Sequence, residues 1–371
     1  MRIGLNLLYL LPGVVGGTET YAVGLLQGLS HIDKQNEYLI FLNREAKNWQ
    51  LPKQDNFIRL ICPVSGKRRW ERFQYEQMVL PRLLRKHNLN VIHSLGYVGP
   101  LFTYCPSIVT IHDLNYQAFG SQMPFIRRMA LKFFVYQSAH RSTRIITVSE
   151  FSKNEILKAF NLHHQKVIVT WEAPLEIFQP RVNGNKIPAL FKNLGIRNPY
   201  AICFSSRSAN KNIPKVIDAF KLTRKRDGIP HQLILIGHLP FDQHPPTDDV
   251  VYTGFLEPSV LEAVLCNAEF LLFPSIYEGF GLPVIEAMAC GVPVVCSNYT
   301  VLPEIAGEAA LYFDPFSIDD MADKISTIAG NIQLRKELQQ KGYDNIQRFS
   351  WDETANKTLE VYKSLLIQSM H

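Results

Sequence analysis

The stretch from Ser275 to Ser297, SIYEGFGLPVIEAMACGVPVVCS, constrains the fold more than any other part of the chain. The apolar run 269–274 before it and the β-branched run Val292–Cys296 near its end are typical of buried parallel strands. Between them a glycine turn leads to Pro283, which suits the first turn of a helix, and Gly291 suits the position just after its end. The sequence therefore predicts a strand, a glycine turn, a short helix and a second strand.

This predicted unit suits a bound phosphate. Gly279 and Gly281 bracket Phe280, so an anion can approach the backbone N–H groups and the positive end of the helix dipole. Glu278 precedes the turn and Glu286 lies on the first turn of the predicted helix, placed to accept hydrogen bonds from hydroxyls on either side of a diphosphate. The alternative is that Glu286 caps the helix and Glu278 is a solvated loop residue.

The spacing of these glutamates within EGFGLPVIEAMACGVPVV resembles the E-x7-E signature of glycosyltransferase family 4, whose members are retaining enzymes of the GT-B fold. The resemblance implies an α/β protein with two Rossmann-like parallel-sheet domains facing a central cleft. It implies an acceptor domain over residues 1–178, a nucleotide-sugar donor domain over 179–350 and a final helix, 351–371, that returns to the first domain. Donor-binding roles follow for the motif residues Gly279, Phe280, Gly281, Leu282, Pro283 and Glu286.

Length and cysteine usage agree with a two-domain intracellular protein. A chain of 371 residues is long enough for two domains, and no uninterrupted apolar run approaches the roughly 18 residues that span a bilayer. The apolar N-terminus could pass for a signal peptide, but a first buried strand running into a glycine loop fits it better. Six cysteines in apolar contexts, without CxxC spacing, predict reduced core residues and a cytoplasmic location.

Charge is concentrated in the first half, where residues 1–180 contain 21 Lys and Arg against 12 Asp and Glu. The segments 67–73, 82–87 and 125–136 mix basic residues with aromatic or aliphatic ones. Such helices suit peripheral contact with an anionic membrane, here the inner face of the plasma membrane, but solvated helices with an inward apolar face fit equally well. No motif indicates nucleic-acid binding.

Near the N-terminus a strand over Arg2–Leu10 is predicted to enter a glycine turn and then a helix over Tyr21–Leu29. The turn lacks the G-x-G-x-x-G fingerprint, which disfavours a nicotinamide-dependent oxidoreductase. The family commonly has a Gly-Gly loop here that faces the diphosphate and the acceptor. The resemblance thus assigns Gly16 and Gly17 to donor binding, against the alternative of an ordinary tight turn.

A second candidate cluster ends the strand that begins at Ile108, where His112 and Asp113 follow the apolar run. The carboxyl ends of parallel strands face the ligand in open α/β sheets. The position resembles the family's HD-type motif, whose histidine hydrogen-bonds the donor sugar, so His112 is assigned a catalytic role and Asp113 a donor-binding role. A lone structural histidine is the alternative.

The proline-rich segment Ala173–Tyr200 is predicted to be a hinge whose closure would exclude water. The next strand is followed by Arg207 and Lys211, a guanidinium and an ammonium that could clamp a diphosphate. Family members often have glycine where Ser205 stands, and many have the arginine one place earlier, which makes Lys211 the firmer assignment. Further along, Gly254 and Phe255 resemble the segment whose backbone reads the nucleotide base.

The mechanism implied by the resemblance retains anomeric configuration. The chain has no D-x-D triplet and no metal-ligand spacing, so no metal or other cofactor is expected, and Lys211 and Arg207 would stabilise the leaving diphosphate. We expect a front-face displacement in which the departing phosphate oxygen helps to deprotonate the acceptor hydroxyl. Glu278 and His112 would hold the sugar and Glu286 the ribose; a covalent nucleophile at Glu278 is the less favoured role.

GDP-mannose is the favoured donor and a UDP-hexose the next, with a saccharide or lipid-linked saccharide as acceptor. These choices rest on the S-x-R-x-x-x-K-N form and the HD-type motif. A GT-B epimerase or phosphorylase would turn over the donor without an acceptor. A non-catalytic nucleotide-sugar-binding protein is the alternative from another class, although the sequence keeps both glutamates, Lys211 and His112.

Overall fold

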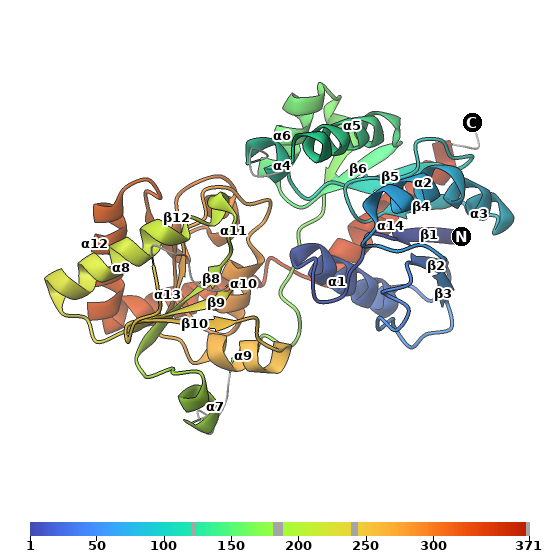
Figure 1. Cartoon of the computed structure of the whole chain (residues 1–371). Coiled ribbons are helices and arrows are strands. Elements are labelled where there is room, and N and C mark those ends of the chain that lie inside the picture. The colour runs from blue at the N-terminus through green and yellow to red at the C-terminus, as the bar shows by residue number, and fades with distance from the viewer. Residues whose placement is uncertain (120–123, 181–187, 239–243, 369–371) are drawn as a thin grey trace. The chain divides into compact units, whose positions relative to one another are not determined.

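The computed structural model describes residues 1–119, 124–180, 188–238 and 244–368. The chain forms two compact units (Figure 1). Unit 1 comprises Met1–Glu172 and Phe349–His371, and unit 2 comprises Ala173–Arg348. The boundaries predicted from the sequence, after residues 178 and 350, lie a few residues beyond these. The predicted hinge includes residues 181–187, which lie outside the described part.

Unit 1 is built on a seven-stranded parallel sheet in the order β3-β2-β1-β4-β5-β6-β7. Its strands are β1 Arg2–Leu7, β2 Glu37–Leu42, β3 Phe57–Ile61, β4 Val91–Ser94, β5 Ser107–Thr110, β6 Arg144–Thr147 and β7 Val167–Val169. Its helices are α1 Gly17–Ile32, α2 Arg69–Met78, α3 Leu80–Lys86, α4 Asn115–Ala118, α5 Phe125–Arg141, α6 Glu150–Phe160 and α14 Trp351–Gln368. The central strands are almost fully buried, as expected when helices cover both faces.

Unit 2 repeats this architecture with a six-stranded parallel sheet in the order β10-β9-β8-β11-β12-β13. Its strands are β8 Tyr200–Ser205, β9 Gln232–Gly237, β10 Val250–Gly254, β11 Phe270–Phe273, β12 Val294–Ser297 and β13 Ala310–Phe313. Its helices are α7 Pro188–Asn193, α8 Ile213–Asp227, α9 Pro258–Cys266, α10 Leu282–Ala289, α11 Leu302–Ala306, α12 Ile318–Gly330 and α13 Ile332–Ile346. Short α7 falls within the predicted hinge.

Strand order reverses between β1 and β4 in unit 1 and between β8 and β11 in unit 2. Open parallel sheets bind ligands outside the carboxyl ends of the strands at such a switch point. The fold thus provides one expected ligand position in each unit. The predicted α/β class with two Rossmann-like parallel sheets is confirmed.

The stretch from Ser275 to Ser297 folds largely as its sequence predicts, with β11 before the glycine turn and β12 after α10. Gly281 takes a φ of 102° as the N-cap of α10, and Gly291 takes a φ of 76° just after the helix ends. The predicted position of Glu286 on the first turn of the helix is wrong. The helix begins at Leu282, before Pro283, so Glu286 is its fifth residue and lies on the second turn instead of the first.

The last helix, α14, packs along α1 within unit 1 (Figure 1). Two glycines of α1 permit the close approach. A Cβ added at Gly24 would lie 2.0 Å from the indole of Trp351, and one at Gly28 would lie 2.2 Å from the Trp351 carbonyl oxygen. A buried hydrogen bond of 2.7 Å between His93 Nδ1 and the Tyr362 hydroxyl joins the same helix to β4.

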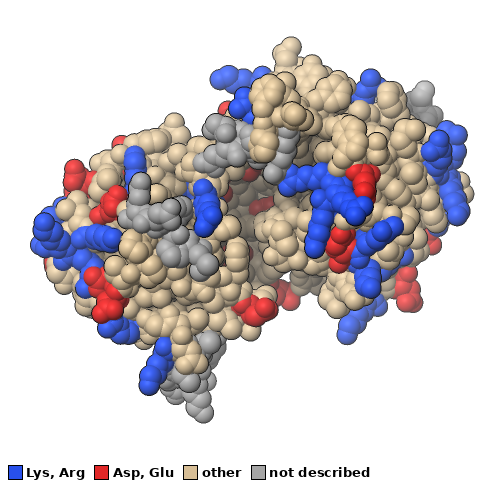
Figure 2. All heavy atoms as spheres, in the orientation of Figure 1, with Lys and Arg blue, Asp and Glu red and all other residues tan. Residues whose placement is uncertain are grey.

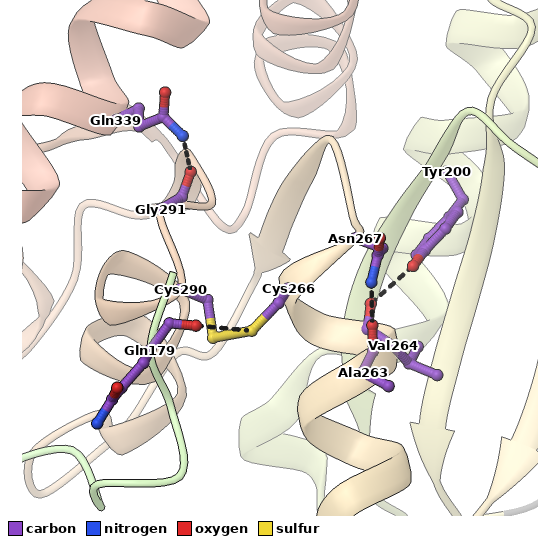
Figure 3. Close-up of a disulfide and its surroundings, with 9 residues drawn as sticks. All are labelled: Gln179, Tyr200, Ala263, Val264, Cys266, Asn267, Cys290, Gly291 and Gln339. Carbon is purple, nitrogen blue, oxygen red and sulfur yellow. Dashed lines mark hydrogen bonds between the residues drawn. A yellow bond between two sulfur atoms is a disulfide. The ribbon is translucent and has the colours of Figure 1, made fainter. Parts of the chain in front are cut away.

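Cys266 and Cys290 form a disulfide in unit 2 (Figure 3). Cys266 ends α9 and Cys290 caps α10, and the packing of these helix ends places their Cα atoms 5.0 Å apart. The prediction that all six cysteines are reduced is therefore wrong for this pair, because sequence spacing did not reveal which helix ends meet. The remaining four are buried thiols. In the described residues, no helix combines the length and the apolar character needed to cross a membrane.

Candidate active site

Lys211 and Glu278 meet at the switch point of unit 2. Lys211 ends the single turn that follows β8, and Glu278 lies in the loop after β11. The distance between Lys211 Nζ and Glu278 Oε1 is 2.6 Å, and the two side chains are only 23% and 15% exposed. The fold thus brings together two predicted site residues that are 67 positions apart in the sequence.

Backbone contacts fix this pair. The Ile276 N–H donates to the Asn210 carbonyl over 2.8 Å, and the Asn210 side-chain amide donates to the Tyr277 carbonyl over 2.9 Å. The ammonium also lies 5.1 Å from the centre of the Phe273 ring. An ammonium has three N–H donors, so Lys211 can contact an anion while it keeps Glu278 as a partner.

The glycine turn offers its backbone to a ligand, since its one large side chain points inward. The Phe280 side chain is 3% exposed and packs in the core, so its predicted part in donor binding would fall to its backbone. Gly281 needs its left-handed backbone, and an added Cβ would lie 3.0 Å from Leu302. Leu282 and Pro283 form the N-terminal end of α10, and Glu286 on that helix is 8% exposed.

The other predicted residues of unit 2 lie at neighbouring strand ends. Arg207 follows β8, is exposed and has no hydrogen bond or ion pair with any described residue. Gly254 ends β10 with a φ of 71° and open space where a Cβ would be. Phe255 is 78% exposed and lies edge-on to His238, with ring centres 5.3 Å apart. The contact that joins Lys211 to Glu278 therefore does not extend to Arg207.

Sequence reasoning missed three buried polar atoms at this switch point. The hydroxyls of Ser205 and Ser275 and the side-chain oxygen of Asn210 are buried without a hydrogen-bond partner. Ser205 ends β8 and Ser275 lies just after β11, next to the predicted cluster. Unpaired buried polar atoms are uncommon in native proteins, so their concentration here indicates a position made for a polar ligand or water. In the sequence, the only signal that could have identified these residues was their position near predicted strand ends.

In unit 1, His112 follows β5 and is 6% exposed. Its Nε2 lies 3.1 Å from the Leu95 carbonyl oxygen and therefore carries a proton, while Nδ1 lies 3.6 Å from a carboxylate oxygen of Glu172. Burial raises the pKa of Glu172, and the neighbouring His112 opposes that rise. Sequence reasoning missed Glu172, because 60 residues separate it from the histidine that it contacts.

Asp113 and the glycine loop complete the predicted residues of unit 1. The Tyr97 hydroxyl donates to Asp113 Oδ1 over 2.9 Å, and Tyr97 holds a left-handed φ of 48°. Non-glycine residues in that conformation are uncommon and concentrate at functional sites. Gly16 has φ 60° and ψ −130°, a conformation suited to glycine, and Gly17 begins α1. These groups follow β1, β4 and β5, at the carboxyl edge of the sheet.

Family models match most of the chain. Residues 15–171 match the model described as Glycosyltransferase Family 4, and residues 186–345 match Glycosyl transferases group 1. The matches cover every strand of the two parallel sheets except β1, and all fifteen residues that the sequence assigned to catalysis or donor binding.

Individual proteins agree with these models. The chain is 31% identical over 288 residues to O-antigen chain mannosyltransferase B of Escherichia coli, covering 72% of this chain and 74% of that protein. Among solved structures, sucrose-phosphate synthase of Thermosynechococcus elongatus matches 99% of this chain and 100% of its own, with a TM-score of 0.75 at 19% identity. The structure of Anabaena HepE in complex with UDP and glucose matches 98% of this chain and 100% of its own, with a TM-score of 0.72 at 17% identity. The chain is a GT-B enzyme and belongs to glycosyltransferase family 4.

Proposed function

We propose that this glycosyltransferase moves a mannosyl group from GDP-mannose to a saccharide acceptor in polysaccharide synthesis, with retention of configuration and without a metal. The observation that carries the proposal is the 2.6 Å contact between Lys211 and Glu278 at the switch point of unit 2. The mannosyl assignment draws on the 31% identity to O-antigen chain mannosyltransferase B.

Unit 2 would bind the donor. The diphosphate would lie between Lys211 and the N-terminal end of α10, where the helix dipole favours an anion. Glu286, on the same helix, would accept hydrogen bonds from the ribose. Gly254 and Phe255 would lie at the base, and Arg207, which is exposed, would approach the diphosphate only in the bound state.

In the proposed front-face displacement, the bond from the sugar C1 to the phosphate oxygen breaks as the bond to the acceptor oxygen forms on the same face. The acceptor hydroxyl proton passes to the departing phosphate oxygen. Lys211 stabilises the charge that develops on that oxygen, an effect of about 3–4 kcal/mol for one well-placed donor. Glu278 would accept a hydrogen bond from a sugar hydroxyl and stabilise positive charge at C1.

His112 would contribute from unit 1. Its Nε2–H now donates to the Leu95 carbonyl, and a hydroxyl of the donor sugar would replace that carbonyl as the acceptor. Glu172, with a carboxylate oxygen 3.6 Å from Nδ1, would keep the ring oriented. Asp113, which accepts from Tyr97, would shape the adjoining backbone.

A UDP-hexose-dependent transferase is the second candidate. Anabaena HepE, which shares the fold, was solved with UDP and glucose, so a uridine nucleotide is the donor class to test against guanosine. An epimerase of the same fold would turn over the nucleotide sugar without an acceptor saccharide, a phosphorylase would transfer a glycosyl group from a saccharide to inorganic phosphate, and a binding protein would consume nothing.

Calorimetric titration with GDP, UDP and ADP in the presence of EDTA tests the proposal. We expect GDP to bind most tightly and its affinity to fall about 10-fold to 100-fold in Lys211→Ala and Glu286→Ala, since each loses a charge-assisted contact. Lys221→Ala, an exposed lysine of α8, is the matched control and should bind GDP like the wild type. Preference for UDP would select the second candidate, and a requirement for added metal would refute the metal-free mechanism.

A further inference from the structure

Two neighbours in unit 1 hold the imidazole of His112. The ring of Tyr21, on α1, meets it edge-on, with ring centres 4.9 Å apart and an angle of 88° between the two planes. A carboxylate oxygen of Glu172 lies 3.6 Å from Nδ1. Charged side chains of both signs are spread over the surface of unit 1 (Figure 2), but Glu172 is only 4% exposed and Tyr21 is fully buried. The orientation of His112 therefore depends on how these two buried neighbours are themselves supported.

The last helix, α14, supports the segment that carries Glu172. Thr354 of this helix is buried, and its hydroxyl donates a hydrogen bond to the carbonyl oxygen of Trp171. That carbonyl belongs to the planar peptide group between Trp171 and Glu172, so the hydrogen bond fixes the backbone from which the carboxylate projects. The same hydroxyl also lies 3.0 Å from the carbonyl oxygen of Ser350, just before α14, so the two carbonyls share its one proton. Thr354 thus ties the helix to the residue that contacts Nδ1 of His112.

The same helix also packs against Tyr21. Trp351 is its first residue, and the ring centre of Trp351 lies 6.1 Å from that of Tyr21. The Tyr21 hydroxyl faces the hydroxyls of Thr110 and Thr170, yet it forms no hydrogen bond of ordinary geometry with a described residue. Burial raises the pKa of Tyr21 to about 12, so the hydroxyl stays neutral. Packing of the ring, and not a hydrogen bond, therefore sets the position of Tyr21 beside His112.

A chain of side chains joins α14 to the strand that precedes His112. The Tyr362 hydroxyl lies 2.7 Å from His93 Nδ1, and His93 Nε2 lies 2.7 Å from the Thr110 hydroxyl. A neutral imidazole has one donor and one acceptor nitrogen, so both contacts can be hydrogen bonds at the same time. Thr110 ends β5, two residues before His112. Three separate contacts of one helix thus lead to the same imidazole.

We propose that α14 is a positioning element for His112 and that it acts through two positioning residues, Thr354 and Tyr21. Thr354 holds the peptide group before Glu172, and Tyr21 limits rotation of the imidazole. Together they keep Nε2 directed to the acceptor that the proposed function assigns to it, a hydroxyl of the donor sugar. The inference rests on that function and adds residues outside the site that determine its geometry. General helix packing accounts for apolar contacts, but not for a buried hydroxyl that bonds the peptide group before Glu172.

Hydrolysis of GDP-mannose measures the effect of Thr354. Thr354→Val keeps the size of the side chain but removes the hydroxyl, and we expect the rate constant to fall about 10-fold, because a small misplacement of a catalytic group lowers the rate steeply. GDP affinity should not change, since GDP lacks the sugar that His112 contacts. Thr354→Ser keeps the hydroxyl and should retain most of the rate. Thr358→Val is the matched control and should hydrolyse the donor like the wild type, because the Thr358 hydroxyl is also buried but bonds the Thr354 carbonyl within α14.

The same substitutions in a His112→Gln background separate positioning from structural support. Thr354→Val should cause no further loss there, because its effect passes through the imidazole that has been removed. Tyr21→Leu should likewise lower the rate only when His112 is present, and Tyr21→Phe, which keeps the ring, should hydrolyse the donor nearly like the wild type. An equal fold-loss in both backgrounds would overturn the proposal, and so would wild-type hydrolysis by Thr354→Val and Tyr21→Leu.

Nitrogen-15 NMR of labelled histidine observes the imidazole without any reaction. The ring signals of His112 are those missing from His112→Gln. We expect Thr354→Val and Tyr21→Leu to shift them and Thr358→Val to leave them in place; unshifted signals in the first two variants would overturn the proposal. Shifted signals in a protein that hydrolyses no donor would support the positioning of His112 and remove only the transferase proposal. Circular dichroism checks that each variant is folded.

Discussion

At the scale of single residues, the proposed mechanism depends on a cation and an anion that lie on two separate loops and are brought into contact by the fold. Lys211 and Glu278 are each supported by their own loop, and the loops are joined through Asn210. The pair is mostly buried, so its charges act in a medium less polar than bulk water. A group held in this way can stabilise a developing phosphate charge without reorganising during the reaction.

Replacing Lys211 tests this role. We predict that Lys211→Ala lowers kcat by about 100-fold to 1,000-fold, because one preorganised donor to the leaving group is lost. Glu278→Gln should also lower kcat, with little change in GDP affinity, because Glu278 is assigned to the sugar. Steady-state kinetics with the nucleotide sugar, beside GDP titration, separates the two effects. Wild-type kcat in Lys211→Ala would be incompatible with the mechanism.

The sequence predicted these residues to different degrees. Lys211, Glu278 and the glycine turn stand next to recognisable strand ends, so local pattern was enough to find them. Glu172 and the unpaired Ser205 and Ser275 hydroxyls acquire meaning only from three-dimensional neighbours. The glycine turn in the sequence did not reveal that the Phe280 ring is buried.

At the scale of elements, α1 and α14 depend on glycine for their approach. We predict that Gly24→Ala destabilises the protein by about 1–3 kcal/mol, since the added methyl would overlap the Trp351 ring. Gly330→Ala, where an added Cβ has nothing within 4 Å, is the control and should be neutral or slightly stabilising. Urea unfolding measures both free energies. An unchanged midpoint for Gly24→Ala would refute the close packing.

The hydrogen bond between His93 and the Tyr362 hydroxyl joins α14 to β4, and it makes the free energy of unfolding sensitive to acid. Burial lowers the pKa of His93 to about 3, so the folded protein keeps it neutral while the unfolded chain binds a proton below about pH 6.5. Its contribution to stability is therefore present above pH 6.5 and is lost as pH falls toward 3, by at most about 1.4 kcal/mol per pH unit.

His93→Gln tests this linkage. The variant should be less stable than the wild type at pH 8, because it loses a fitted hydrogen-bond pair. Its free energy of unfolding should then fall less steeply between pH 6.5 and 4. Urea unfolding across that range measures the slope, and parallel profiles for the two proteins would contradict the assigned pKa.

The disulfide between α9 and α10 gives a countable prediction. Thiol titration of the denatured, unreduced protein should find four reactive cysteines, and titration after reduction should find six. Cys266→Ser should leave one additional thiol, that of Cys290. Six thiols without reduction would contradict the disulfide and support the prediction from the sequence that all six cysteines are reduced.

At the scale of the whole molecule, each unit has a parallel sheet with the same reversal of strand order. We propose that unit 2 binds the donor at this position and that unit 1 contributes His112. Apolar runs and glycine turns predicted individual buried strands, because each buried parallel strand leaves a local signature, and the resemblance to glycosyltransferase family 4 implied their arrangement in two parallel sheets. Cavities leave no such local signature in the sequence. The cavity of unit 1 that Tyr9, Arg72 and Tyr97 line is assembled from five or more separate segments, so no local pattern predicted it, although the basic and aromatic mixture at 67–73 marked the helix that borders it.

The central claim, a retaining transferase that uses GDP-mannose, is tested most directly by proton NMR of donor hydrolysis, in which water replaces the unknown acceptor. The enzyme is incubated with GDP-mannose, UDP-glucose or ADP-glucose in the presence of EDTA, and the released sugar is observed before its anomers equilibrate. We expect release from GDP-mannose alone, with the first mannose in the anomeric configuration of the donor, and a rate at least 100-fold lower in Lys211→Ala. Release of the opposite anomer would contradict retention, and release from UDP-glucose in preference to GDP-mannose would contradict the assigned donor.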